Sequence, residues 1–121
     1  MNNQTVDIFN PKTIRATMGS IFRVPFVYVP DLAPVLEQMH AKGIHTYAAH
    51  LKGQEYYDSF SFREPTAFLI GNEGNGLSKE ISDQAGQYLK IPMEGRGESL
   101  NASIAAALLM YEAHRQRSAR L

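Results

Sequence analysis

The stretch from Ile91 to Glu112, IPMEGRGESLNASIAAALLMYE, joins a short apolar strand to a polar glycine loop and then to a long apolar helix. Gly95 and Gly97 allow tight backbone turns in this loop. Ser99 and Asn101 follow, and side chains of these types cap helices or orient bound groups. The stretch therefore predicts the point at which the fold presents a functional loop.

The helix that follows the loop has an apolar face. Ile104, Leu108 and Tyr111 recur at helical spacing, with Leu109 and Glu112 beside them. Two interpretations of this face stay open, namely a core within the chain and a seam between two copies of it.

The composition indicates one globular domain, 1–121. The chain has 121 residues of which 44% are hydrophobic, enough to bury one core. Its 12 basic and 12 acidic residues cancel. Recognition of RNA would therefore depend on a local basic patch, because the overall field is not positive.

Several classes of protein are disfavoured by the same composition. The chain has no cysteine, and its four histidines show no ligand spacing with a carboxylate, so we expect no metal site. No apolar run approaches the roughly twenty residues that span a bilayer, and the N-terminus, MNNQTVDIFN, does not resemble a signal peptide. We expect a cytoplasmic protein with no membrane partner.

Apolar segments with strand-like composition alternate with segments of helical periodicity along most of the chain. A helix of about three turns is expected from Pro11, since Asn10-Pro11 is a helix-entry signal. Further helices are expected from Asp31 to Gly43 and from Ser78 to about Ala85. Strands are predicted at 26–29, 44–49, 66–70 and 88–91. The alternation predicts an α/β fold with a mostly parallel sheet and helices on both faces.

Two side-chain groups have both a structural and a functional interpretation. Lys12, Arg15 and Arg23 give the first helical region three positive charges and no acid, which fits a solvated face or a phosphate-binding patch about equally. The aromatic residues between 56 and 62 are able to stack on bases, but such a cluster more often pins a loop onto its domain, and we favour that interpretation.

Two polar loops follow predicted strands, GNEGNG after Ile70 and PMEGRGESLN after Ile91. Ligands of parallel sheets bind at the carboxyl ends of strands, so both loops are candidates for a binding site. The glycines of the first loop do not have the G-x-G-x-x-G spacing, and no Gly-Lys-Ser/Thr follows as in a P-loop. The loop offers backbone donors and acceptors beside the acid Glu73.

Three segments together resemble a known family: PKTIRATMGSIFRVPF, AFLIGNEGNGLS and IPMEGRGESLNASIAAALLMYE. They look like the C-terminal part of a TrmH-like RNA 2′-O-ribose methyltransferase of the SPOUT class, and the resemblance extends from about Phe9 to about Arg115. The GNEGNGLS segment and the SLNASIA run after IPM match the family's second and third motifs.

The resemblance implies an α/β domain with a C-terminal trefoil knot that binds S-adenosylmethionine. It implies RNA, either rRNA or tRNA, as the substrate, and a homodimer as the assembly. Glu73, Ser99 and Asn101 would lie beside the reacting ribose or the methionine end, and Lys12, Arg15 and Arg23 are the candidates for RNA contacts. The residues implied to surround the cofactor are Ala49, His50, Ile70, Gly71, Asn72, Gly74, Ile91, Pro92, Met93 and Leu100.

The sequence departs from the family pattern near its start. Family members carry an upstream motif whose arginine is credited with activating the ribose hydroxyl, and we find no such motif before Lys12. Arg15 matches a later arginine of the family. The expected first strands and the small substrate-binding domain are missing as well.

Three hypotheses follow from this departure. The chain is a methyltransferase whose arginine comes from another chain or from the missing part, or it is a truncated cofactor-binding fragment without independent catalysis. A third hypothesis is an α/β module that binds a different nucleotide.

Overall fold

The structure of the protein is a computed structural model that describes residues 1–2, 5, 7–50, 53–71, 76–92 and 101–118. The chain divides into two compact units, Met1–Leu32 and Ala33–Leu121. In the described residues, no helix is both long enough and apolar enough to cross a membrane.

The larger unit is built around a parallel sheet of three strands, β1 (His45–Ala49), β2 (Thr66–Leu69) and β3 (Gln87–Leu89). The strand order is β2-β1-β3, so β1 is central and pairs with both neighbours in parallel. The predicted strands at 44–49, 66–70 and 88–91 are therefore confirmed, with ends shifted by one or two residues.

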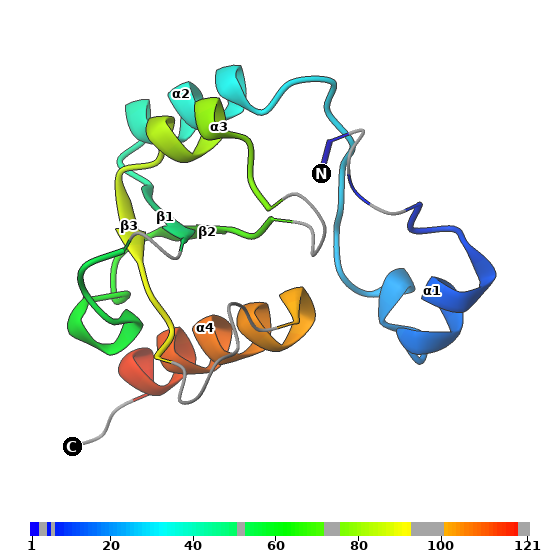
Figure 1. Ribbon diagram of the computed structural model, residues 1–121. Helices are drawn as coiled ribbons and strands as arrows, with labels where there is room; N and C mark the ends of the chain where they lie inside the picture. Colours follow the sequence, from blue (N-terminus) through cyan, green and yellow to red (C-terminus); the bar gives the residue numbers. More distant parts are fainter. Residues whose placement is uncertain (3–4, 6, 51–52, 72–75, 93–100, 119–121) are drawn as a thin grey trace. The chain divides into compact units, whose positions relative to one another are not determined.

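Helices lie on both faces of this sheet, as the alternation predicts (Figure 1). On one face are α2 (Ala33–Ala41) and α3 (Lys79–Gln84), and on the other is α4 (Ala102–Arg117). The side-chain amide of Gln84 donates to the Ala33 backbone carbonyl at 2.9 Å and connects α3 to the start of α2.

The main core lies between the sheet and α4. Phe62, Leu89 and Leu109 are fully buried there, and each contributes roughly 2 kcal/mol by leaving water. The Phe62 ring contacts the Tyr47 and Phe68 rings edge to face, with centroids 5.1 and 5.0 Å apart. The aromatic segment thus pins its loop onto the domain, which confirms the interpretation favoured from the sequence, although Tyr56 is exposed.

The last turns of α4 hold the segment that leads into β2. The Gln116 side chain donates to the Phe60 carbonyl at 2.9 Å and accepts from the Phe62 amide at 2.6 Å. Arg117 donates to the Phe62 carbonyl at 2.8 Å. These bonds satisfy backbone donors and acceptors of the segment before β2, which lies outside the sheet. They therefore hold the C-terminal end of α4 at one position along the sheet.

The apolar face predicted on this helix does not form the core. Ile104 and Tyr111 are 52% and 73% exposed, and Leu108 is also exposed. The side chains that α4 buries are one position further along, at Ala105, Leu109, Glu112 and Ala113.

The smaller unit differs from two predictions. The helix α1 covers only Pro11–Ala16, followed by a 3₁₀ turn η1 at Ser20–Phe22. Met18 and Gly19 have φ angles of 50° and 89°, and left-handed residues end a right-handed helix. The prediction of three continuous turns is therefore wrong.

The predicted buried strand at 26–29 is also wrong. This segment is extended but exposed, and Val27 is 66% accessible. Its backbone bonds to Met1, whose amino group donates to the Val27 carbonyl at 3.0 Å and whose carbonyl accepts from the Val29 amide at 2.7 Å. A strand needs a neighbouring strand to complete its ladder, and none of the described residues supplies one.

Glu112 makes the stability of α4 dependent on pH. Its buried carboxylate accepts from Arg115 Nε and Nη2 at 2.9 and 2.7 Å and from Gln116 at 3.0 Å. The bonds from Arg115, followed by that from Gln116, lower the pKa of Glu112 from about 4.5 to about 2. Since the folded pKa is depressed, the stabilisation is complete above the unfolded pKa and is lost as pH falls from about 4.5 through about 2.

We expect Glu112→Gln to lower the melting temperature at neutral pH, and the difference from the wild-type protein to shrink as pH falls through that window. Thermal melts followed by circular dichroism across the pH range measure this. A difference that stays constant with pH would contradict the assignment.

Candidate functional site

The carboxyl ends of the three parallel strands meet at one edge of the sheet. Six of the predicted cofactor-binding residues lie within three positions of these ends, in the described part of the chain. Ala49 ends β1 and His50 follows it, Ile70 and Gly71 follow β2, and Ile91 and Pro92 follow β3 after Lys90. The sheet therefore brings three segments together that are far apart in sequence.

The end of β1 is fixed to β3 by backbone bonds. The His50 amide donates to the Leu89 carbonyl at 3.0 Å, and the Gly53 amide donates to the His50 carbonyl at the same distance. A Cβ atom at Gly53 would lie 2.9 Å from the carbonyl carbon of Leu89, so only glycine fits this approach. The segment after β3 is held in turn, because the Lys90 amide donates to the Glu55 carbonyl at 2.9 Å.

Gly71 marks a second close approach, at the end of β2. A Cβ atom there would lie 2.3 Å from the Leu77 nitrogen and 2.4 Å from the Gly76 carbonyl carbon. The backbone that leaves β2 therefore passes directly against the backbone that enters α3. A side chain at this position would push the two segments apart.

Asn101 has a clear structural role at the start of α4. Its Oδ1 atom accepts from the Ser103 and Ile104 amides at 2.9 and 3.4 Å and from the Ser103 hydroxyl at 2.5 Å. This is an N-cap, which by itself explains an asparagine here. The bonds use the carbonyl oxygen of the side chain, so a contact with a ligand would come from its Nδ2 group.

The other predicted residues of this site lie outside the described part of the chain. They are Asn72, Glu73, Gly74, Met93, Ser99 and Leu100.

The candidate RNA-binding residues belong to the smaller unit. Lys12 and Arg15 are exposed on α1, and Arg23 is exposed just after η1, where its guanidinium donates to the Met18 carbonyl at 3.4 Å. Asn10 caps α1 by accepting from the Lys12 amide at 2.9 Å. The three positive charges are thus exposed within one unit.

Tyr88 and Asp83, which lie beside the predicted site residue His50, were not predicted from the sequence. The rings of His50 and Tyr88 are stacked, with centroids 4.9 Å apart and planes 17° apart. The Tyr88 hydroxyl donates to Asp83 Oδ1 at 2.8 Å, and this bond raises the pKa of Tyr88. No motif signals this contact, because the residues come from three elements that only the fold brings together.

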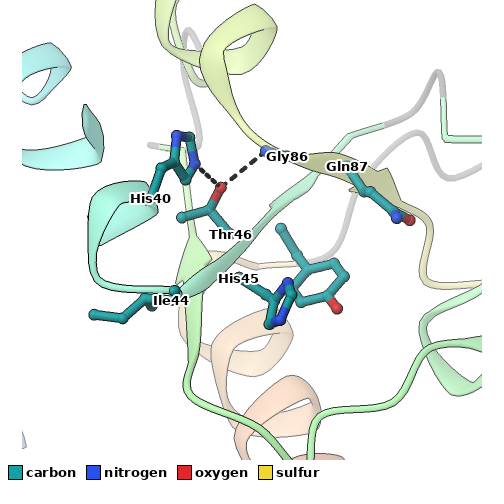
Figure 2. A pocket seen from close by; sticks show the side chains of 8 residues that line it. His40, Ile44, His45, Thr46, Gly86 and Gln87 are labelled. Atoms are coloured by element: carbon teal, nitrogen blue, oxygen red, sulfur yellow. Dashed lines mark hydrogen bonds between the residues drawn. The ribbon is translucent and has the colours of Figure 1, made fainter. Parts of the chain in front are cut away.

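A pocket of about 270 Å³ lies at the opposite, amino-terminal edge of β1 and β3, where His40, Thr46 and Gly86 contribute to its lining (Figure 2). Its polar groups bond to one another. The buried Thr46 hydroxyl accepts from the Gly86 amide at 2.8 Å and lies 2.8 Å from His40 Nε2. These atoms are engaged within the protein, and the pocket lies at the other edge of the sheet from the carboxyl ends of the strands.

The described residues contain no cluster of three or more His, Cys, Asp or Glu side chains with the arrangement of a metal site.

A parallel α/β sheet with glycine-lined loops at its carboxyl edge defines a class of ligand-binding α/β proteins, and comparison with known proteins identifies the family. Residues 1–111 match the SpoU rRNA Methylase family. The chain belongs to this family, and the resemblance to TrmH-like RNA methyltransferases is confirmed.

Two curated relatives come from Bacillus subtilis (strain 168). The putative TrmH family tRNA/rRNA methyltransferase YacO is 36% identical over 104 residues, which cover 86% of this chain and 42% of the relative. The 23S rRNA (guanosine(2553)-2′-O)-methyltransferase RlmP is 33% identical over 111 residues, covering 92% of this chain and 44% of the relative. This chain therefore spans less than half the length of these relatives.

Among solved structures, the SpoU methyltransferase AviRb from Streptomyces viridochromogenes, crystallised with the cofactor AdoMet, has a TM-score of 0.87 to this chain. The two are 35% identical, and the alignment covers 97% of this chain and 48% of AviRb.

We expect Gly71→Ala to destabilise the larger unit by about 1 to 3 kcal/mol, because the added methyl group meets backbone on both contacts and neither can move cheaply. Gly43→Ala is the matched control. Gly43 has open space around it but a φ of 75°, so it reports the cost of backbone strain alone, about 1 kcal/mol.

Urea unfolding of both variants measures the difference. A Gly71→Ala variant as stable as the wild-type protein would show that the two segments do not meet closely.

Proposed function

We propose that this chain forms the S-adenosylmethionine-binding part of an RNA 2′-O-ribose methyltransferase that acts on rRNA or tRNA. The observation that carries the proposal is the convergence of three strand ends at one edge of the sheet, in a chain that belongs to the SpoU rRNA methylase family. A relative, RlmP, is named for 2′-O-methylation of 23S rRNA.

The residues at this edge suit the cofactor chemically. Ala49, Ile70, Ile91 and Pro92 are uncharged, and the first three are half-buried. Such a wall accepts an adenosine and does not repel a sulfonium cation. Gly71 and Gly53 let neighbouring backbone segments of the chain meet closely at this edge. In the proposed site, backbone donors and acceptors of these segments would bind the base and ribose. Asn72, Gly74, Met93 and Leu100 complete the proposed cofactor site, together with His50.

The proposed reaction is an in-line displacement in which a ribose hydroxyl attacks the methyl group that the bound cofactor supplies. Its main requirements are alignment of the two reactants and removal of the hydroxyl proton. Asn101 and Ser99 would orient the reactants with neutral groups, which place no positive charge beside the sulfonium. Glu73 would accept a hydrogen bond or complement positive charge. Because the cap uses Asn101 Oδ1, its proposed contact is made by Nδ2.

Further parts of the proposal concern the whole domain. Residues 1–121 would form one SPOUT-like domain in which the C-terminal stretch makes a trefoil knot around the cofactor. Lys12, Arg15 and Arg23 would bind RNA phosphates, since all three are exposed cations. The protein would be cytoplasmic, where its RNA substrates are found.

The exposed face of α4 supports the proposed homodimer. Ile104, Leu108 and Tyr111 lie on one stripe of the helix and are all exposed. A second copy would cover this apolar stripe, which monomeric proteins rarely leave in water.

Leu108→Glu would place a charge in the stripe and is expected to convert dimer to monomer in sedimentation velocity, while Glu37→Lys on α2 changes charge without this effect. A monomer mass for the wild-type protein would contradict the dimer.

Calorimetric titration with S-adenosylhomocysteine tests the proposed function. We expect one site per chain, with competition by S-adenosylmethionine and none by adenosine phosphates. Competition by adenosine phosphates alone would favour a module for another nucleotide. Absence of binding would contradict both a methyltransferase and a cofactor-binding fragment.

A methyl-transfer assay on ribosomal and transfer RNA then separates these last two. The fragment hypothesis is favoured by one observation, the chain's span of less than half of its relatives. Turnover by the isolated chain would support the enzyme.

If the isolated chain turns over, the variant Asn101→Ser tests the role of Asn101. Serine retains a capping oxygen, so we expect this variant to keep the wild-type melting temperature and to lose turnover. A variant that loses both stability and turnover would assign Asn101 to the helix cap alone.

A further inference from the structure

His50 occupies a central place in the larger unit. It directly follows β1, the middle strand, and its amide is bonded to the Leu89 carbonyl of β3 at 3.0 Å. Its carbonyl accepts from the Gly53 amide. The backbone at His50 is thus held at the carboxyl edge of the sheet, between the segments that follow β2 and β3.

The His50 ring has its own support. Side chains alternate across a strand, so His50 lies on the same face as Ala48, and Ala48 pairs directly with Tyr88 in the sheet register. His50 and Tyr88 are therefore diagonal neighbours on one face, within reach of a ring contact. The small side chain of Ala48 between them leaves space for the stack, whose centroids are 4.9 Å apart.

Tyr88 is in turn held by a different layer of the fold. Its hydroxyl donates to Asp83 at 2.8 Å, and Asp83 lies on α3, the helix that covers this face of the sheet (Figure 1). The contact therefore runs from α3 through β3 to the end of β1. These contacts restrict the rotamers of both rings next to the candidate site.

We propose that Tyr88 and Asp83 are positioning residues for the cofactor-binding end of β1, where they fix the orientation of the His50 ring. This inference rests on the proposed function, because it assigns the His50 side chain to the cofactor site. A ring that is already held in one orientation loses less freedom when a ligand binds beside it, so loosening the stack weakens cofactor binding.

The test is the dissociation constant for S-adenosylhomocysteine, measured by calorimetry on the full chain. Tyr88→Leu removes the stack and is expected to weaken binding about three- to tenfold. Tyr88→Phe keeps the ring but not the bond to Asp83, so we expect a smaller loss. Asp83→Ala removes the acceptor of the same bond, so we expect its loss of binding to match that of Tyr88→Phe.

Variants of two histidines, one at each end of β1, provide the control. His50→Ala is expected to weaken binding, and His50→Phe, which keeps a flat ring for stacking, is expected to restore most of it. His45→Ala is matched to His50→Ala at the other end of β1, where His45 pairs with Glu64 at 2.9 Å. We expect His45→Ala to leave binding unchanged.

Proton NMR of the wild-type protein gives a result that does not depend on whether a variant folds. Addition of S-adenosylhomocysteine is expected to shift the His50 ring protons, which feel the ring current of Tyr88, and to leave those of His45 in place.

Three results would overturn the inference: a Tyr88→Leu variant with a lower melting temperature but an unchanged dissociation constant, a His50→Ala variant that binds normally, or His50 resonances that do not respond. If the wild-type protein itself does not bind, the proposed function fails first, and the two failures are distinguishable.

Discussion

The parallel pairing of β1 with both β2 and β3 is the constraint on which the rest of the larger unit depends. Parallel strands run in one direction, so their carboxyl ends meet at one edge and every connection must cross back over a face of the sheet. The connection from β2 to β3 does so through α3, while α2 precedes β1 and α4 follows β3, and together these helices cover the two faces. The same geometry gathers His50, Gly71 and Ile91 at one edge, although they are separated by about twenty residues each in sequence.

Packing against α4 makes this arrangement rigid. Leu109 is buried against Phe62 and Leu89, and the polar ends of Gln116 and Arg117 satisfy the backbone before β2. Apolar burial supplies the energy, and the directed bonds select one register of the helix on the sheet. At the opposite edge Thr46 joins β1 to the α3–β3 connection in a similar way, through the bond from the Gly86 amide. The site edge is thus supported by contacts on both faces of the sheet.

Much of the fold of the larger unit is predictable from sequence, because short apolar runs alternate with amphipathic segments and with helix signals such as the cap at Ser78. The smaller unit is less predictable. The segment 26–29 has the composition of a strand, but composition does not supply a pairing partner, and Val27 is exposed. The helix from Pro11 is interrupted by the left-handed backbone at Met18, for which a methionine gives no signal. The helix periodicity of Ile104, Leu108 and Tyr111 is correct, yet it does not say which face meets the sheet.

The positions of the candidate site follow from the resemblance of two loop motifs to a family, and the fold places six of the expected residues at the strand ends. The stack of His50 on Tyr88 and the bond to Asp83 are not predictable from the chain alone, since three elements must first be assembled. The central claim is therefore that the carboxyl edge of the sheet is the proposed cofactor site.

Hydrogen–deuterium exchange with and without S-adenosylhomocysteine tests this claim most directly. The account predicts slower exchange on binding at His50, Gly53 and Gly71, and no change at His45 at the amino edge. Protection confined to the amino edge, or no protection at the three strand-end amides in the presence of saturating ligand, would contradict it.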